Sequence, residues 1–394
     1  MNTANASEGP RRAWATYLLI AVFLVLLWAP TFDAIFHVDG SRAAGENRLP
    51  AGPPDVRELR AGHVQKFIAA SEAYFNDHFG FRKKLIRLFQ NWKLGLFHDR
   101  SVYKVLIGPN QWLFIGEEQM VEHYLGLAKF TPEQLQTWQT MLEKRRDWLA
   151  AHGIKYLFVV PPDKQDIYPE ELPLWLQKAA PAQRHSKLDQ FLEHMKAHST
   201  VEILDLRAPL LAAKQEAPVY LREDTHWNLL GGFIACQEVI KALTRQMPEL
   251  PPLPREDFDW TNVPAAGGDL AHMLGTEAPE KNYFKPLPKP SVSLPVMHEA
   301  TELVSAWNAH KSNVVTENPA PLTATAMVFH DSFGNAWRQF LGCSFKRIVF
   351  MGENREFNQR LILDNHPQVV INEILERYFN TQDPQELLAH DHLP

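Results

Sequence analysis

A strand, a sharp turn and a helix follow one another over residues 323–341, and this segment constrains the fold more than any other. The run 323–329 is β-branched and apolar, which predicts a short buried strand. Residues 330–333 then predict a tight turn, and residues 335–341 predict the start of a helix. The arrangement places the Ser332 hydroxyl at the carboxyl end of a strand, where open α/β sheets carry their sites. Backbone N–H groups at the amino end of the helix could hold an oxyanion there.

A second segment, residues 220–228, supplies the partners that a serine nucleophile needs. Asp224 and His226 lie two residues apart, at the mouth of another predicted helix. A serine is activated by a general base and the base is oriented by a carboxylate, so Asp224, His226 and Ser332 are the residue types of a catalytic triad. Helix capping is the alternative for both turns, because Asp, Ser and Thr are common N-caps, and here Asp224 or Thr225 would be the cap.

The Asp-Thr-His-Trp segment that begins at Asp224 and the Asp-Ser-Phe segment that begins at Asp331 resemble the alginate O-acetyltransferase AlgJ/AlgX family. Further stretches resemble the same family in the same order along the chain: 46–48, 76–82, 112–114, 160–164, 168–169, 268–270 and 376–378. Together they cover about residues 46–380. Two positions depart from the family pattern, because Gln111 and His330 stand where relatives usually have glycine.

The resemblance implies an α/β fold like that of SGNH hydrolases, with a parallel sheet flanked by helices. In this family the Asp-x-His element precedes the serine turn, which is a circularly permuted order of the motifs. The resemblance also implies a periplasmic O-acetyltransferase that acts on alginate or another exopolysaccharide, with Asp224, His226 and Ser332 as its triad and an acetyl-serine intermediate. The implied partners are a membrane-bound O-acyltransferase, which donates the acetyl group because acetyl-CoA is cytosolic, and other proteins of an export complex.

Two other functions stay open at this point. Transfer and hydrolysis pass through the same acyl-serine and differ only in the second acceptor, so a carbohydrate acetylesterase of the same fold is one alternative. The other is a non-catalytic, polysaccharide-binding scaffold of an export complex, in which the three residues only cap helices. No metal or other cofactor is expected, since the sequence has no P-loop, no dinucleotide fingerprint and no zinc-site cysteines.

Candidates for holding the oxyanion or the substrate are Asn335, Lys164, Tyr168, Trp227 and Arg377. Lys164 and Tyr168 follow the carboxyl end of a buried strand predicted over 154–160, and an ordinary solvated loop is the alternative for them. Arg377 follows another predicted strand, and a surface cluster of ion pairs is the alternative for it and its acidic neighbours Glu373 and Glu376.

The amino-terminal segment carries a targeting signal. Residues 13–30 are apolar and have about the minimum length that spans a bilayer. Arg11 and Arg12 precede this run, so the positive-inside rule keeps residues 1–12 in the cytoplasm and sends the rest outward. The sequence therefore predicts a single-pass signal anchor in the inner membrane with its catalytic domain in the periplasm; a cleaved signal peptide is the alternative.

One globular domain is expected after the anchor. The predicted parts are a tether at 31–54, the SGNH-like domain at 55–380 with an irregular proline-rich insertion at about 248–321, and a tail at 381–394. Periodicity predicts helices over 56–75, 81–97, 131–152, 182–198 and 228–247, and strands over 102–107, 112–115, 154–160, 201–206, 346–351 and 367–372. Thr131 as N-cap with Gln134 at N3 predicts a capping box for the helix over 131–152, and Gly153 predicts its end. Residues 108–111 predict a hairpin turn, and the adjacent Gly231 and Gly232 suggest close packing of the helix over 228–247. Strands that alternate with helices predict a parallel sheet with right-handed crossovers.

Composition limits the remaining choices. The formal net charge of -6 argues against nucleic acid as a partner, and an acidic polysaccharide would need a local basic patch. The cysteines Cys236 and Cys343 are expected to be buried thiols, with one bridge as the alternative. The spacing of Asp269 and His272 is read as helix capping and not as a metal site. The run that contains Asp391, between two histidines of the tail, is expected to be inert.

Overall fold

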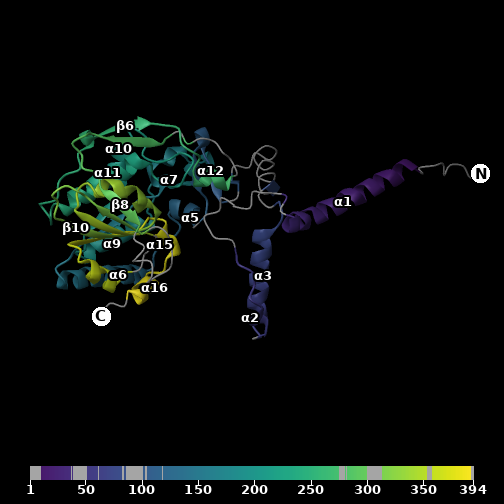
Figure 1. Cartoon of the computed structure of the whole chain (residues 1–394), viewed down its shortest axis with the longest axis horizontal. Helices are drawn as coiled ribbons and strands as arrows, with labels where there is room; N and C mark the ends of the chain where they lie inside the picture. The colour runs from purple at the N-terminus through teal and green to yellow at the C-terminus, as the bar shows by residue number, and fades with distance from the viewer. Residues whose placement is uncertain are drawn as a thin grey trace, which may run out of the picture. The chain divides into compact units, whose positions relative to one another are not determined.

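The computed structural model describes residues 10–36, 38, 51–60, 62–81, 84–85, 101–102, 104–117, 119–274, 280, 282–299, 313–352 and 357–391 (Figure 1). The chain forms two compact units. One comprises residues 1–99 together with 272–275, and the other comprises residues 100–271 and 276–394. The second unit holds the large sheet and both motif-bearing turns.

The first unit is helical where it is described. Helix α1 (Pro10–Phe36) contains an 18-residue stretch, Thr16–Asp33, with a mean hydropathy of 1.8, so it is long and apolar enough to cross a membrane. The helix continues through Pro30 and ends six residues beyond the predicted anchor. The predicted orientation of this helix and the bounds of the tether and domain stay predictions.

The single helix predicted over 56–75 is wrong. The chain forms two helices instead, α2 (Val56–Arg60) and α3 (Val64–His78). Gly62 lies between them with a φ of 82°, a left-handed conformation that ends a helix and that glycine adopts at little cost. Most of the helix predicted over 81–97 lies outside the described residues.

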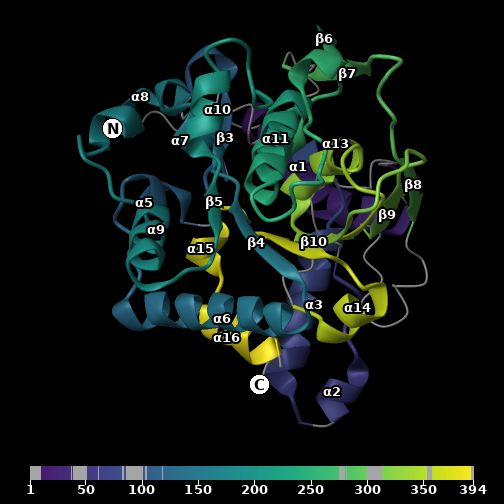
Figure 2. The same ribbon diagram turned by 90° about the vertical axis from the view of Figure 1, so that its left-hand side faces the viewer.

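A seven-stranded sheet organises the second unit (Figure 2). Its strands, in spatial order, are β5 (Ile203–Asp205), β4 (Lys155–Val160), β12 (Val369–Glu373), β10 (Thr325–His330), β11 (Arg347–Gly352), β9 (Val314–Glu317) and β8 (Val296–Glu299). The first five strands are parallel, as predicted, and the last two pair antiparallel at one edge. Strands β8 and β9 come from the predicted insertion, which therefore extends the sheet and is not only a loop.

The central strands are buried on both faces, which explains their nearly continuous apolar sequences. Side chains alternate along β10, so that Ala326 and Val328 face one hydrophobic core while Met327 and Phe329 face the other. The helices α10 (Arg207–Ala213), α11 (Leu229–Leu243) and α13 (Arg338–Leu341) cover the first face. The helices α6 (Pro132–Ala151), α9 (Lys187–His198), α14 (Gln359–Asn365) and α16 (Pro384–His390) cover the second (Figure 2).

Several helix boundaries follow from the predicted capping chemistry. Helix α6 begins with the predicted capping box, in which the Thr131 side chain accepts from the Gln134 amide and Gln134 bonds back to the Thr131 amide. Gly153, with a φ of 73°, follows its end as predicted. Helix α9 begins later than predicted, because a second capping box at Ser186 starts it at Lys187.

Two small sheets flank the main one. Strands β1 (Ser101–Val102), β2 (Val105–Ile107) and β3 (Leu113–Ile115) form an antiparallel sheet, and η1 (Pro109–Gln111) makes the predicted turn between β2 and β3. The strand predicted over 102–107 is two strands, because the chain reverses at Lys104, whose φ is 72°. Strands β6 (Phe258–Asn262) and β7 (Phe284–Pro288) form a hairpin within the insertion.

The remaining short elements are α5 (Met120–Tyr124), α7 (Lys164–Ile167), η2 (Pro169–Glu171), α8 (Leu174–Ala179), η3 (Arg255–Asp257), α12 (Asp269–Met273), η5 (Ser332–Trp337) and α15 (Tyr378–Thr381). Both cysteines are free thiols, as expected, but only Cys236 is fully buried, whereas Cys343 is half-buried.

The end of the chain is not inert. Asp391 is 1% exposed and accepts two hydrogen bonds from the buried guanidinium of Arg145, at 2.6 and 2.7 Å. The same guanidinium also donates to Asn372 at the end of β12. The expectation that the tail is inert is therefore wrong at Asp391, which anchors α16 to α6 and the sheet.

Replacing Asp391 with alanine should destabilise the protein by about 3–5 kcal/mol, because the Arg145 charge would be left buried without its partner. Urea denaturation of the purified protein measures this loss. Asp364, which lies on the exposed surface of α14 beside Arg360, provides the control, and Asp364→Ala should leave the free energy of unfolding close to wild type. Equal effects of the two substitutions would contradict this account.

Candidate active site

The structure brings the three triad candidates into contact. Ser332 Oγ lies 2.7 Å from Nε2 of His226, and Nδ1 of the same ring lies 2.6 Å from Oδ1 of Asp224. Ser332 comes from the turn that follows β10, whereas Asp224 and His226 come from the turn that precedes α11, about a hundred residues earlier in the sequence. The contacts have the geometry that a serine, a base and an orienting carboxylate require.

The serine turn is held by Asp331 and not by the serine itself. Asp331 is the N-cap of η5, and its carboxylate accepts from the amides of Phe333 and Leu375, each at 2.9 Å. The capping alternative therefore holds for Asp331 but not for Ser332, whose hydroxyl faces His226. The predicted helix start is a 3₁₀ turn that begins at Ser332 itself, before the short helix α13.

The capping alternative is wrong for the other turn. Helix α11 is capped by Asn228, whose side-chain oxygen accepts from the Gly231 amide at 3.0 Å. Asp224 instead accepts from the backbone and the ring of His226. The pair of glycines at the start of α11 allows the close packing that the sequence suggested, since a Cβ on Gly232 would lie 2.6 Å from that of Ala336 in η5.

The charges of Asp224 and His226 depend on each other. Burial opposes ionisation of Asp224, but the hydrogen bond and charge of His226 hold the pKa of the carboxyl well below its usual range. Burial likewise opposes protonation of His226, yet the hydrogen bond and charge of Asp224 raise the pKa of the imidazole above its usual value. The site is therefore built to stabilise an imidazolium.

Lys164 supports the histidine turn through hydrogen bonds to backbone carbonyls. The side chain is 3% exposed, and its Nζ donates to the carbonyls of Leu113, Arg222 and Asp224 at 2.6, 2.9 and 2.9 Å. Burial lowers the pKa of Lys164 to about 7, against the opposing charge of Asp224. The solvated-loop alternative is wrong for Lys164, because the ammonium binds backbone carbonyls inside the protein, and its predicted contact with substrate stays a prediction.

Tyr168 is buried as well, at 6% exposure. Its hydroxyl accepts from the Val219 amide at 2.9 Å, and its ring stacks on Trp112 at 4.4 Å. The solvated-loop alternative is wrong here too, since the side chain supports the segment that leads into the histidine turn, and the predicted contact of Tyr168 with substrate stays a prediction.

Trp227 joins the two turns. Its Nε1 donates to the Phe333 carbonyl at 3.1 Å, and its ring packs edge to face on Phe333 at 5.0 Å. The buried indole is thus placed to fix the distance between the histidine and serine turns. Asn335 is exposed in η5, and its predicted role at the oxyanion stays a prediction.

Glu373 at the end of β12 and Glu376 and Arg377 just after it are buried, so the surface-cluster alternative is wrong. Glu373 accepts from the Asp331 amide at 2.8 Å. Arg377 pairs with Asp163 at 3.1 Å, and its guanidinium lies 5.9 Å from the centre of the Phe333 ring. Arg377 therefore lies close to the triad, and its predicted contact with substrate stays a prediction.

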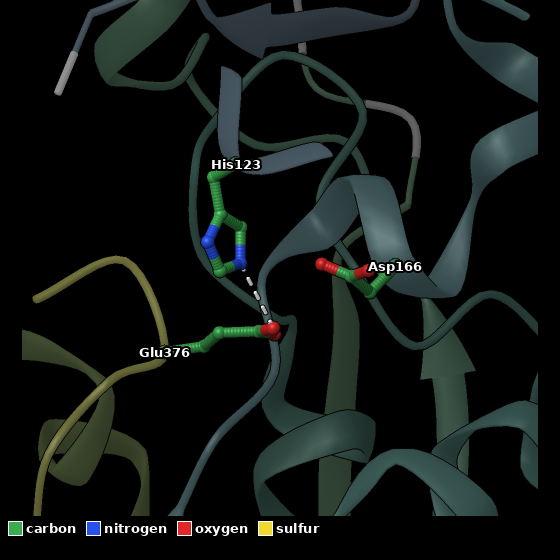
Figure 3. A group of neighbouring side chains, drawn as sticks. All are labelled: His123, Asp166 and Glu376. Carbon is green, nitrogen blue, oxygen red and sulfur yellow. Dashed lines mark hydrogen bonds and ion pairs between the residues drawn. The ribbon is translucent and has the colours of Figure 1, made fainter. Parts of the chain in front are cut away.

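Two groups of three side chains in the described part of the chain have ligand atoms close enough for a metal ion. One group consists of Asp224 and His226 of the triad together with Asp269. The other group is buried and consists of His123, Asp166 and Glu376 (Figure 3). The sequence pointed to neither His123 nor Asp166 as a site residue. No periodic or motif signal marks His123, because its partners lie more than forty residues away in sequence.

The geometry of this second group favours an ion pair over a metal. His123 Nε2 lies 3.0 Å from Glu376 Oε1, and Nδ1 lies 3.1 Å from Oδ1 of Asn380 (Figure 3 shows the first contact). Both ring nitrogens face oxygen acceptors, so the ring carries two protons and has no lone pair for a metal. Burial opposes this charge, but Glu376 raises the pKa of His123 to about 9.

A family model described as "SGNH hydrolase-like domain, acetyltransferase AlgX" matches residues 105–323. This range contains Asp224 and His226 and ends just before β10, so Ser332 lies outside it. Among solved structures, that of Bacillus cereus PatB1 superposes with a TM-score of 0.50 at 17% identity, over 71% of this chain and 98% of that chain. This likeness concerns the fold alone.

Curated relatives carry the name probable alginate O-acetylase AlgJ. The protein of Pseudomonas syringae pv. tomato is 29% identical over 183 residues, which is 46% of this chain and 44% of the relative. The protein of Azotobacter vinelandii is 26% identical over 321 residues, which is 79% of each. The chain thus matches less than half the length of the first of these relatives and more than three quarters of the second.

These matches confirm the predicted resemblance and the SGNH-like α/β fold. The family model alone covers more than half of the chain. The chain belongs to the family of SGNH hydrolase-like domains of the acetyltransferase AlgX.

Proposed function

We propose that this protein is a polysaccharide O-acetyltransferase that uses Ser332 as its nucleophile. The observation that carries the proposal is the continuous chain of hydrogen bonds from Ser332 through His226 to Asp224. The family to which the chain belongs and the printed names of its relatives support acetyl transfer to a polysaccharide. The scaffold alternative loses its basis, because Asn228 and Asp331 supply the caps that the triad candidates would have supplied.

The first half of the reaction forms an acetyl-serine. His226 takes the hydroxyl proton as Ser332 Oγ attacks the acetyl carbonyl, and Asp224 holds the ring in the tautomer whose Nε2 is free. The bond from the carbonyl carbon to the donor oxygen then breaks, and the donor leaves with the proton from His226. The backbone N–H of Ser332, with Asn335 as a further candidate, holds the oxyanion, and one such donor typically contributes about 3–4 kcal/mol.

The second half delivers the acetyl group. A sugar hydroxyl loses its proton to His226 and its oxygen attacks the acetyl carbonyl. The bond from the carbonyl carbon to Ser332 Oγ then breaks, and His226 returns the proton to Oγ, so the sugar leaves as its acetyl ester. Water in place of the sugar would give an esterase, so the acceptor decides between the two activities. The proposed polymer is alginate or another exopolysaccharide, in keeping with the relatives named alginate O-acetylase.

The proposed location is the outer face of the inner membrane. Helix α1 is suited to a single-pass anchor, and the arginines before the apolar run favour a cytoplasmic amino terminus. Because acetyl-CoA is cytosolic, we propose that a membrane-bound O-acyltransferase supplies the acetyl group and that other export-complex proteins present the polymer. The permuted order of the two motifs is part of the same proposal.

Ser332→Ala and His226→Ala should each lower turnover of an activated acetyl ester by at least about a thousandfold, because the nucleophile or its base is lost. Acetyl transfer to an oligosaccharide panel, followed by mass spectrometry, should be lost in parallel. The control is Ser291→Ala, which removes an exposed hydroxyl far from the triad in sequence. A structural cap would instead cost about 1 kcal/mol of stability and leave turnover unchanged.

The pH dependence of kcat/KM should show His226 acting as a base. Turnover needs the neutral ring, so the rate should rise with pH, and its midpoint should lie above the ordinary histidine value of about 6.5, since Asp224 raises the pKa. Asp224→Asn should move that midpoint to lower pH and cut kcat by about 10⁴-fold, because the ring loses both its charge partner and its tautomer. A midpoint unchanged in this variant would contradict the assigned pairing.

A further inference from the structure

The insertion reaches the triad through Asp269, the first residue of α12. The Asp269 amide donates to Oδ2 of Asp224 at 2.9 Å. Its carboxylate accepts in return from the Thr225 amide at 2.8 Å and from the Thr225 hydroxyl at 2.6 Å. Three hydrogen bonds therefore clamp the turn that carries the base to a segment more than forty residues away.

The carboxylate of Asp269 also lies behind the base. Its Oδ2 is 3.8 Å from Nδ1 of His226, and the Thr225 hydroxyl contacts both atoms, at 2.6 Å from Oδ2 and 3.3 Å from the nitrogen. Two carboxylates therefore lie on the Nδ1 side of the imidazole. Asp224 is hydrogen-bonded to Nδ1 at 2.6 Å, and Asp269 lies farther away, at 3.8 Å. The Asp269 carboxylate also accepts from the Leu270 amide at 2.7 Å, but this bond within α12 explains none of the contacts with the histidine turn.

Gly268 makes this approach possible. A Cβ at this position would lie 2.3 Å from Cβ of Asp224, a distance that no side chain can occupy. The backbone before Asp269 is therefore packed directly against the orienting carboxylate. The Gly268-Asp269 pair functions as one unit, in which the glycine allows contact and the aspartate makes the bonds.

We propose that Asp269 is a positioning residue for the base of the proposed transferase. It fixes the Asp224-Thr225-His226 turn and places a second negative charge behind the imidazolium that forms when Ser332 gives up its proton. This proposal rests on the proposed function, in which His226 is the base that activates Ser332. It also assigns the insertion a task, because the site is incomplete without a residue that the core α/β pattern does not supply.

The charges around His226 support this role. Asp224 and Asp269 face its Nδ1 side, Ser332 faces Nε2, and the guanidinium of Arg377 lies near enough to oppose protonation. Burial lowers the pKa of His226, and the two carboxylates together outweigh burial and Arg377. The Lys164 ammonium donates to the backbone carbonyl of Asp224.

The test compares Asp269→Asn with Asp259→Asn in the otherwise intact protein. Asn at 269 keeps an oxygen acceptor for Thr225 and removes the charge, whereas Asp259 is exposed on β6 of the same insertion and serves as the matched control. NMR titration of the imidazole gives the pKa of His226 directly. We expect Asp269→Asn to lower the pKa of His226 and to reduce kcat at least tenfold with little change in KM. Asp269→Glu should restore part of both.

A His226 pKa and a kcat that are the same in Asp269→Asn and Asp259→Asn would overturn the proposal. The NMR titration needs no turnover, so it still tests Asp269 if the wild type transfers no acetyl group, a result that would count against the proposed function alone. Should Asp269→Asn fail to fold, Thr225→Val removes one clamp bond and leaves both carboxylates in place. A fall in kcat relative to Asp259→Asn then supports the proposal, and equal kcat values overturn it.

Discussion

The pairing of Asp331 with the backbone after β12 is the constraint on which the site depends. Its carboxylate bonds both to its own turn, at Phe333, and to Leu375 beyond the neighbouring strand, while its amide bonds to Glu373. The ends of two central strands are thereby joined at the point where the chain leaves the sheet. Ser332 follows at once, so its hydroxyl is aimed by a rigid frame. A nucleophile needs such placement, because a shift of about 1 Å can cost a hundredfold in rate.

The histidine turn is fixed in a different way, by groups from outside the central sheet. Lys164 donates to backbone carbonyls of this turn, and Asp269 of the insertion accepts a hydrogen bond from Thr225 within it. Trp227 donates to the Phe333 carbonyl and so connects the histidine turn to the serine turn. These groups are buried or half-buried and satisfied by hydrogen bonds, so the base meets the nucleophile without help from a ligand. In the proposed function, substrate contacts come from residues around the triad, for which Arg377 and Asn335 are candidates.

The sequence predicted the parts of this structure that depend on local chemistry. Apolar runs marked the buried strands β4, β10, β11 and β12, and a capping box marked the start of α6. The pairing of the two turns also followed from residue types alone. Groups whose partners are distant in sequence were misjudged: a solvated loop was the alternative for Lys164, Asp391 was assigned to an inert tail, and His123 was missed. Burial and ion pairing across the fold are set by tertiary packing, and no local pattern encodes them.

The most direct test of the central claim is to isolate the covalent intermediate. The soluble part of the protein is mixed with an activated acetyl ester, quenched with acid within one turnover, digested and analysed by mass spectrometry. The account predicts one acetyl group on Ser332 in the wild type and none on the same peptide when Ser332 is alanine. Turnover without acetylation of Ser332 would contradict the account. An acetyl-enzyme intermediate on a different residue would contradict it as well.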